Sequence, residues 1–394
     1  MSSIRIAHSK IRHFSPRLAK RVIVFALLCG TTGAYAACGT ASGVSFYGLL
    51  DAAVQATDSG GATGNTTGGV SSGNSRGSRL GVRGRCILQP GIAGIFDLEA
   101  GINLNNGTFK NYFGDPTSVK PTLLNGSTTT GFNRRSFVGL ETPMGIFTIG
   151  RDYSPVFYAA YGSDALALDY FGNFQEVVPI IGGADQWARF SNAVFYKSPT
   201  IHGFTERIAY SFGSESTGAI GTPPSKSDSV IGIGGAFHKG NLLLNASWQR
   251  TKIPSVAQGA FTGNLDSRTD WLIGGTYRIG LAKIALGHWN VDFPTTSTAD
   301  WIGISYAMLG GKAMAQTIAL KTDVNGGPNK SGTSIAVAYE HPLGNGAAWY
   351  MSYGQVSNGA NSAYPLVSGD YAVVPGALGA TVRGLAVGYR MTFN

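Results

Sequence analysis

Arginines and carboxylates are the residues of this chain whose types and spacing could do chemistry. These residues recur in several short segments. One segment ends at Arg151, and a long stretch rich in acidic and aromatic residues follows it. The basic candidates are Arg79, Arg83, Arg134, Arg151 and Arg189, and the acidic candidates are Glu99, Asp164 and Asp169. Cations facing acids across a narrow watery passage create a transverse field, and rings of Arg or Lys favour anions. The expected chemistry is therefore the selection of ions and polar solutes.

The element that must position these residues is a β-hairpin followed by a long loop. Its first arm, Phe132–Leu140, is followed by a tight turn at Thr142–Gly145 and a second arm that ends at Arg151. Beyond it lie more than thirty residues rich in Tyr, Phe, Gly and Asp, which we assign to a loop over 153–188. Loops of this length in a compact domain are usually functional. The hairpin is expected to place arginines at the mouth of the loop.

Composition favours strands that have one face in lipid. Charged residues make up only 13% of the 394 residues, and glycine is abundant at 57 residues. No apolar run outside the N-terminus approaches the ~18 residues of a membrane helix. Alternating strands of a membrane barrel fit this composition, although a secreted β-sandwich or β-helix would share part of it.

The first 36 residues have the features of a secretory signal peptide. Six cations and no acid precede the apolar run Val22–Leu28, and Ala34-Tyr35-Ala36 supplies an A-x-A cleavage site. Cleavage would lower the net charge from +9 to about +3, so the basic pI gives no support to nucleic-acid binding. Lipoprotein cleavage before Cys38 is the alternative, but Tyr35 stands where a Leu-like residue is needed. The barrel domain is expected to span 37–394.

Sixteen segments with period-2 alternation are bounded by turn residues. Short turns carrying Pro, Gly or Asn alternate with longer polar stretches, including Thr57–Ser78, Thr251–Ser267 and Val356–Gly379. This asymmetry is typical of an all-β fold, a transmembrane antiparallel β-barrel with periplasmic turns and extracellular loops. The expected strands are Val44–Asp51, Arg79–Arg85, Ile92–Asn103, Phe132–Glu141, Gly145–Arg151, Arg189–Lys197, Phe204–Phe212, Val230–Phe237, Leu242–Arg250, Thr269–Arg278, Lys283–Asp292, Ala299–Met308, Met314–Lys321, Thr333–Glu340, Ala347–Gln355 and Val382–Phe393.

The two faces of the later strands agree with this assignment. In the last strand Leu385, Val387 and Tyr389 share one face, and small or polar residues share the other. Aromatic residues also recur near the strand ends that approach short turns or the C-terminus, where a periplasmic girdle would lie. They are Tyr196, Phe237, Tyr277, Tyr339 and Tyr389. Ordinary core tyrosines, the alternative, would not share this position.

Cys38 and Cys86 are the cysteines left after Cys29 departs with the signal peptide. Cys38 precedes the first strand and Cys86 lies by the first short turn, so both are expected at the periplasmic rim. Two free buried thiols are possible, but disulfides persist in exported proteins. We therefore predict a Cys38–Cys86 bridge, and we expect no metal site and no cofactor.

Several motifs resemble the Gram-negative trimeric porins, most of all their β-proteobacterial branch. They include Phe46–Asp51, Ser78–Gly84, Phe96–Glu99, Phe132–Leu140 and Gly145–Tyr153. The resemblance implies sixteen strands, a trimer, and a third loop folded into the pore opposite wall arginines. It assigns Arg79, Arg134, Arg151 and Arg189 to a basic cluster, and Asp164 or Asp169 to its acidic counterpart. The family's C-terminal residue is usually Phe, whereas here Asn394 follows Phe393.

The function expected from these observations is passive diffusion of small hydrophilic solutes and ions across the outer membrane, with a mild anion preference. The expected partners are outer-membrane lipid, two further copies of the chain in a homotrimer, and the outer-membrane assembly machinery, with no nucleic acid. A substrate-specific channel is the main alternative, because aromatic residues of the long loop could form a slide for sugars. They are Tyr158, Tyr161, Tyr170, Phe171 and Phe174.

Two further alternatives are an outer-membrane hydrolase and a closed structural barrel. A hydrolase would need a His near a Ser, but His202, His238 and His341 fall in or beside short turns, and His288 shares a face with Ile284 and Leu286. Lack of conductance would favour the closed barrel. Catalysis is not expected.

Overall fold

Sixteen strands form the wall of the molecule in a computed structural model that describes residues 43–61, 66–110, 131–174, 187–213, 225–257, 260–293 and 295–394. The predicted signal peptide and Cys38 lie outside these ranges. The wall strands are β1 (Gly43–Asp58), β3 (Arg79–Gln89), β4 (Ile92–Asn103), β6 (Arg135–Thr142), β7 (Gly145–Tyr153), β8 (Arg189–Lys197), β9 (Phe204–Ser211), β10 (Val230–Lys239), β11 (Leu242–Ala257), β12 (Ala260–Ile279), β13 (Ala282–Asp292), β14 (Thr296–Met308), β15 (Gly311–Thr322), β16 (Lys330–Gly344), β17 (Ala347–Asn358) and β20 (Val382–Phe393).

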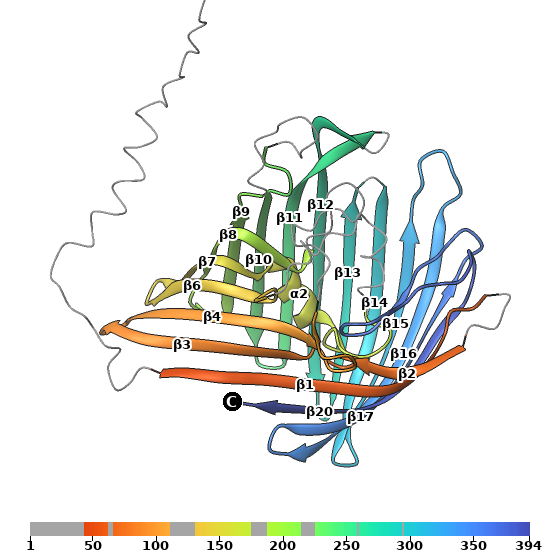
Figure 1. Ribbon diagram of the computed structural model, residues 1–394, viewed down its shortest axis with the longest axis horizontal. Coiled ribbons are helices and arrows are strands. Elements are labelled where there is room, and N and C mark those ends of the chain that lie inside the picture. The colour runs from red at the N-terminus through yellow and green to blue at the C-terminus, as the bar shows by residue number, and fades with distance from the viewer. Residues whose placement is uncertain are drawn as a thin grey trace, which may run out of the picture.

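The wall closes because the first and last strands are neighbours (Figure 1). One edge of β1 pairs with β20, from Gly48↔Phe393 to Asp58↔Arg383, and the other edge pairs with β3, from Gly43↔Arg85 to Leu49↔Arg79. Every other wall strand pairs antiparallel with its sequence neighbours. The prediction of a sixteen-stranded antiparallel barrel is confirmed. We call the end with the tight turns, such as Thr142–Gly145, the short-turn end, and the opposite end the loop end.

Apolar side chains cover the outside of the wall. Leu385 and Val387 of β20 are 48% and 49% exposed, whereas Ala386 between them is 1% exposed. Strand β16 repeats the pattern, with Ile335 and Val337 exposed and Ala336 buried. The two faces therefore alternate with the period of 2 that a strand imposes. The predicted outward face of both strands is correct.

The second strand of the wall is interrupted. Strand β2 (Thr66–Ser72) pairs with β1 from Asp58↔Thr66 to Ala52↔Ser72, and β3 then continues along the same edge. Between β2 and β3, residues 73–78 leave the wall. Hydrogen bonds around Asp51 hold this inward segment: the Gly73 N–H donates to the Asp51 carbonyl (2.9 Å), and the Arg76 N–H donates to the Asp51 carboxylate (3.0 Å). The sequence had suggested one long loop over Thr57–Ser78, which is corrected here.

A second correction concerns the loop expected over Thr251–Ser267. Strands β11 and β12 continue past the other strands at the loop end as a paired hairpin (Figure 1), with Thr251 opposite Arg268 and Pro254 opposite Leu265. A register shift lies between Pro254 and Val256. The hairpin extends beyond the apolar outer face of the wall, so neither of its faces needs apolar residues. Its composition is therefore polar, and composition alone indicated a loop.

The segment between β7 and β8 enters the barrel, as predicted. It contains helix α2 (Pro155–Ser163), which begins where the Ser154 hydroxyl accepts a hydrogen bond from the Phe157 N–H (3.0 Å) and where Pro155 suits the first turn. The helix packs against β10, β11 and β12. Within the described ranges no helix has the length and apolar character needed to cross a membrane.

The hydrophobic core lies inside the barrel, between this loop and the wall from β12 to β20. Phe174 stacks on Trp301 with ring centroids 4.4 Å apart, and it meets Trp289 edge to face. The loop between β17 and β20 also folds inward, with a two-stranded sheet of β18 (Leu366–Val367) and β19 (Ala372–Val373). The Gly172 N–H donates to the Val367 carbonyl (2.8 Å), so the two inward loops join. One half of the lumen is therefore filled.

Candidate functional site

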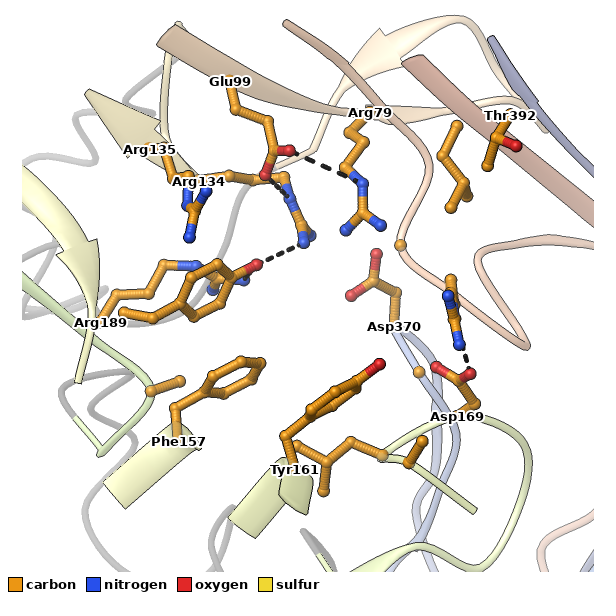
Figure 2. Close-up of a pocket in the computed structure, with 18 of the residues that line it drawn as sticks. Arg79, Glu99, Arg134, Arg135, Phe157, Tyr161, Asp169, Arg189, Asp370 and Thr392 are labelled. Carbon is orange, nitrogen blue, oxygen red and sulfur yellow. Dashed lines mark hydrogen bonds and ion pairs between the residues drawn. The ribbon is translucent and has the colours of Figure 1, made fainter. Parts of the chain in front are cut away.

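An open cavity of about 480 Å³ lies in the lumen between α2 and the strands β1, β3, β4, β6 and β8. Figure 2 shows Arg79, Arg134 and Arg189 on one side of it and Phe157 and Tyr161 of α2 on the other. Six arginines and four carboxylate side chains of the described residues line it. They are Arg76, Arg79, Arg83, Arg134, Arg135, Arg189, Asp97, Glu99, Asp169 and Asp370.

Six of the eight predicted charged residues line this cavity: Arg79, Arg83, Arg134, Arg189, Glu99 and Asp169. They come from five separate segments. Strand alternation turns Arg79, Arg83 and Glu99 inward, whereas Arg134 precedes β6 and Asp169 lies on the loop after α2. The inward parity of Arg79, Arg83, Asp97 and Glu99 could be read from the sequence.

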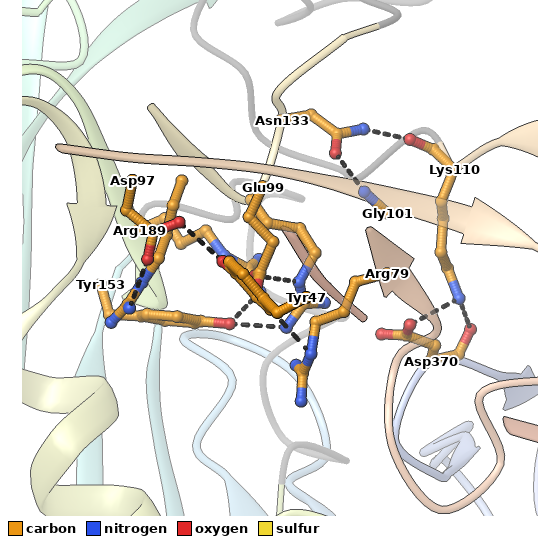
Figure 3. Close-up of polar contacts among 12 residues, drawn as sticks. Tyr47, Arg79, Asp97, Glu99, Gly101, Lys110, Asn133, Tyr153, Arg189 and Asp370 are labelled. Carbon is orange, nitrogen blue, oxygen red and sulfur yellow. Dashed lines mark hydrogen bonds and ion pairs between the residues drawn. The ribbon is translucent and has the colours of Figure 1, made fainter. Parts of the chain in front are cut away.

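Glu99 of β4 is the centre of the basic side. Arg134 donates from Nε to the Glu99 carboxylate (2.6 Å), and Arg79 lies 3.7 Å from the same carboxylate (Figure 3). The Tyr153 hydroxyl accepts from Arg134 (2.6 Å) and from Arg189 (3.1 Å). The guanidinium of Arg189 also lies 4.5 Å from the centre of the Tyr153 ring. One acid and one tyrosine thus fix the directions of three arginines.

A second set of contacts lies beside the first. Arg135 forms ion pairs with Asp97 (3.2 Å) and Asp152 (3.0 Å). Tyr47 of β1 donates its hydroxyl proton towards Asp97 (2.6 Å), and the Arg83 guanidinium lies 4.8 Å from the Tyr47 ring centre. Charge-assisted hydrogen bonds of this kind are roughly twice as strong as neutral ones. The basic side is consequently held in a fixed arrangement.

The acidic side comes from loops. Asp169, on the loop after α2, pairs with Arg76 of the inward segment (2.7 Å). Burial raises the pKa of Asp169 to about 7, against the opposing effect of the Arg76 charge. Asp370, on the loop between β17 and β20, pairs with Lys110 (3.1 Å) and lies near the middle of the view in Figure 2.

Two predicted residues, Arg151 and Asp164, do not line the cavity. Arg151 lies at a register shift between Gly150 and Asp152, which turns its side chain so that it donates to the Asn133 carbonyl (2.8 Å) and the Ser191 hydroxyl (2.6 Å). Asp164 ends α2 and accepts from the N–H groups of Leu166 (3.1 Å) and Leu168 (2.8 Å). Burial raises the pKa of Asp164, and those two N–H groups oppose the shift. Arg151 therefore holds the backbone at Asn133, and Asp164 holds the backbone at Leu166 and Leu168.

The sequence had missed four charged cavity residues as site candidates: Arg76, Asp97, Arg135 and Asp370. Arg76 was assigned to an outer loop. Arg134 and Arg135 are adjacent, so alternation allows only one of them to face inward, but β6 begins at Arg135 and Arg134 precedes the strand. Asp370 is held inside by the Asp370 N–H bond to the Gly73 carbonyl (2.9 Å). No local signal in the sequence indicates that such a loop folds inward.

The aromatic slide suggested for the long loop does not exist as proposed. Tyr170, Phe171 and Phe174 are at most 1% exposed, because they pack against the wall. Tyr161 and Tyr158 do line the cavity, together with Phe157. Three of the five predicted slide residues therefore hold the loop in place and do not face a solute.

Cys86 is disulfide-bonded. Cys38 lies outside the described residues, so the Cys38–Cys86 pairing stays a prediction. In the part of the chain that the structure describes, no group of three or more His, Cys, Asp or Glu side chains is arranged to hold a metal ion.

Comparison with known proteins adds sequence and structural relatives. Residues 24–361 match the family described as Gram-negative porin. An outer membrane porin protein of Bordetella pertussis is 24% identical over 357 residues, which cover 80% of this chain and 84% of that protein.

The barrel also superposes on solved structures. The anion-selective porin from Comamonas acidovorans gives a TM-score of 0.73 at 25% identity and covers 89% of this chain and 100% of its own. The trimer form of OmpT, an outer membrane protein of Vibrio cholerae, gives 0.64 at 18% identity, with coverage of 89% and 99%.

Proposed function

This chain belongs to the Gram-negative porin family, and on that premise we propose that its arginine-lined cavity is the constriction of a water-filled channel for small hydrophilic solutes, with a mild preference for anions. As a porin it lies in the outer membrane, with its apolar outer face in lipid and its strands forming the channel wall. The proposal includes no catalytic step.

The observation that carries the proposal is the imbalance of charge around the cavity. Six arginines and four carboxylate side chains line the cavity, and the inward loops pack against the wall from β12 to β20. With screening of ~8 Å at physiological salt, only charges near the constriction act on a passing ion. An excess of positive charge there lowers the energy of an anion and raises that of a cation.

The surplus of positive charge lies on the wall side, where Asp97 and Glu99 offset only part of it. Arg79, Arg134 and Arg189 stand on the wall, and Asp169 and Asp370 stand on loops that face it (Figure 2). A polar solute can align its dipole with the resulting transverse field, whereas a large apolar solute loses hydration with no compensation. In this proposal Arg83 extends the basic wall, Glu99 orients the arginines, and Arg151 and Asp164 act as positioning residues.

Arg79 is the residue with which to test the proposal. Its side chain is 22% exposed and only 3.7 Å from Glu99, whereas Arg134 is buried and its removal would leave Glu99 without its closest partner. In planar bilayers under a KCl gradient, the wild-type protein should conduct with a reversal potential on the anion side. Arg79→Gln should keep the conductance and lower the chloride-to-potassium permeability ratio about twofold, from a lost unit charge screened over ~8 Å.

Arg383→Gln is the matched control, because Arg383 is exposed on the outer face at the loop end and pairs with Asp58. It should leave the permeability ratio unchanged. A cation-side reversal potential of the wild type would reject the anion preference and keep the channel. Absence of conductance from correctly folded protein would reject the channel.

We also propose that the protein is exported by cleavage near Ala36, assembled by the outer-membrane machinery, and active as a homotrimer. A trimer form is known for the Vibrio cholerae OmpT, whose fold this chain shares. On β1, Val44 and Phe46 are 66% and 76% exposed, an apolar surface that a neighbouring barrel could cover. Stepwise channel openings in threes would support the trimer, and single independent steps would contradict it.

A further inference from the structure

Another pocket lies beside the first turn of α2, next to the arginine-lined cavity, with which it shares Tyr153 and Tyr158. Its volume is about 220 Å³, and Pro155 and Tyr158 of α2 cover it from one side. The wall strands β4 to β9 form the rest of it, towards the short-turn end. Ile146, which follows Gly145 of the tight turn, and Lys197, the last residue of β8, mark that end.

Two cations face each other in this pocket. Lys197 and Arg207 are direct cross-strand partners in the β8–β9 register, and both line the pocket. Like charges directly opposite each other destabilise a sheet. Arg207 stacks on Tyr158, with its guanidinium 3.6 Å from the ring centre. Among the described residues neither cation has a carboxylate within ion-pair distance, and Asp152, the acid that lines the pocket, is 3.0 Å from Arg135.

The floor of the pocket is apolar, which is unusual for the inner face of a water-filled barrel. Ile95, Phe137, Ile146 and Phe195 come from β4, β6, β7 and β8, and all four have the inward parity. Their strand neighbours confirm it, because Val138 and Phe147 are exposed on the outer face. An inorganic anion gains nothing from such a floor, whereas a ring or short alkyl chain does.

From this combination we infer that the pocket is a binding subsite for small organic anions that carry one apolar group, with a single-ring aromatic carboxylate as the type. The inference rests on the proposed channel function, since solutes reach the pocket through the lumen. The carboxylate lies between Lys197 and Arg207 and relieves their repulsion, and the ring lies on Ile146 and Phe195. Drug-sized ligands need ~300–1,000 Å³, so a pocket of about 220 Å³ selects one ring.

Equilibrium binding of 4-fluorobenzoate to the purified, folded protein, followed by fluorine NMR, tests the inference. The wild type should bind the probe, and acetate, which lacks the ring, should fail to compete at the same concentration. Lys197→Gln should weaken binding about tenfold through loss of a charge-assisted contact. Ile146→Thr should weaken it through the floor while keeping both cations.

Lys312→Gln is the matched control. Lys312 also faces the lumen, but it lies on β15, on the far side of the barrel, where Glu340 of β16 is its cross-strand partner. It should bind the probe like the wild type. Circular dichroism establishes that each variant is folded, and chloride conductance is recorded on the same preparations.

The inference is overturned by a wild type that conducts chloride but does not bind 4-fluorobenzoate, or by equal binding to the wild type and both pocket variants. Equal competition by acetate would also overturn it, because the apolar floor would then play no part. A folded protein that fails to conduct would reject the channel instead, so failures of the two proposals can be told apart.

Discussion

At the scale of single residues, the site depends on charges that are already paired before a solute enters. Arg134 is 4% exposed and Glu99 5% exposed; they pair with each other, and Arg134 also donates to the Tyr153 hydroxyl. Breaking a buried pair by removing one partner costs about 3–5 kcal/mol. Arg79 and Arg83, which lie closer to the open cavity, can change with less effect on the fold. We therefore expect selectivity and stability to depend on different arginines.

We expect Asp169 to give this site a pH dependence near neutrality. Burial raises its pKa to about 7, so lowering the pH from 8 to 6 protonates the carboxylate and leaves the charge of Arg76 uncompensated. The lumen becomes more positive by one charge, so the chloride-to-potassium permeability ratio should rise about twofold. Reversal potentials at the two pH values measure it.

Asp169→Asn should hold the ratio at its low-pH value at both pH values, because the amide cannot lose a proton. Asp266→Asn serves as the control, since Asp266 lies on the β11–β12 hairpin and accepts from Ser255. It should keep the wild-type pH response. A pH response that survives Asp169→Asn assigns the titration to another group.

The sequence predicted most of the wall side of the site, and the reason is alternation. Arg79, Arg83 and Glu99 lie on strands whose period of 2 fixes the face of every residue once one is known. That rule ends where a strand ends or shifts register, as at Arg134 and Arg151. Arg76 and Asp370 depend on loops whose direction is decided by contacts with distant strands, and a single sequence does not carry that information.

At the scale of elements, Phe171 is one of three aromatic side chains, with Tyr170 and Phe174, that pack the loop between β7 and β8 against the wall. Phe171 is fully buried between two strand glycines: a Cβ on Gly354 would lie 2.7 Å from the Phe171 Cβ, and one on Gly384 would lie 2.8 Å from its ring. Ala167, Leu168 and Tyr170 near the loop tip have positive φ values of 56°, 58° and 63°. Such conformations cost ~1–3 kcal/mol each, and burial of the tip offsets that cost.

Gly384→Ala should loosen the loop. The new methyl group overlaps the Phe171 ring, and overpacking of this kind costs about 1–3 kcal/mol. Because the loop tip already carries strained backbone, we expect it to detach from the wall part of the time. In single-channel recordings this would appear as current flicker and larger conductance.

Gly235→Ala is the control for a strand glycine, because its Cβ would meet nothing closer than the Thr205 carbonyl at 3.8 Å. It should record like the wild type. Gly384→Ala currents without added flicker, at the wild-type conductance, would show that the contact between Phe171 and Gly384 does not hold the loop in place.

The strands themselves could be predicted because alternation and turn residues are local signals. All sixteen expected strands exist, with ends that move by several residues. The interrupted second strand could not be predicted, because Asp51 of β1 holds the inward segment from across the sheet. Polar composition also concealed the β11–β12 extension, since a hairpin outside the membrane has no apolar face to reveal it.

At the scale of the whole molecule, the barrel is divided into a packed half and an open half. The wall from β12 to β20 carries inward Trp289, Trp301 and Ile318, and the loops cover them. The opposite wall carries the arginines, and no loop core covers it at the level of the cavity. We therefore expect the conducting path to follow the basic wall, because the loops cover the apolar side.

Removal of residues 382–394 should abolish folding altogether. Strand β20 pairs with both β17 and β1, so its loss leaves two open edges whose backbone groups have no partner in lipid. Each unsatisfied group costs several kcal/mol in a bilayer. Removal of Asn394 alone, which lies beyond β20, should leave the barrel intact. Protease resistance after refolding in lipid measures both, and a resistant core from the shorter chain would contradict the expectation.

The pairing of β1 with β20 affects the order in which the barrel can assemble. The edge of β1 from Gly48 to Asp58 finds its partner only in the final strand, so it stays open until almost the entire chain has crossed the inner membrane. Unpaired edges are templates for aggregation, and the apolar outer face has no lipid around it during that interval. The risk of aggregation is therefore greatest before insertion, while the chain is in the periplasm. It lasts until the final strand is available to pair with β1.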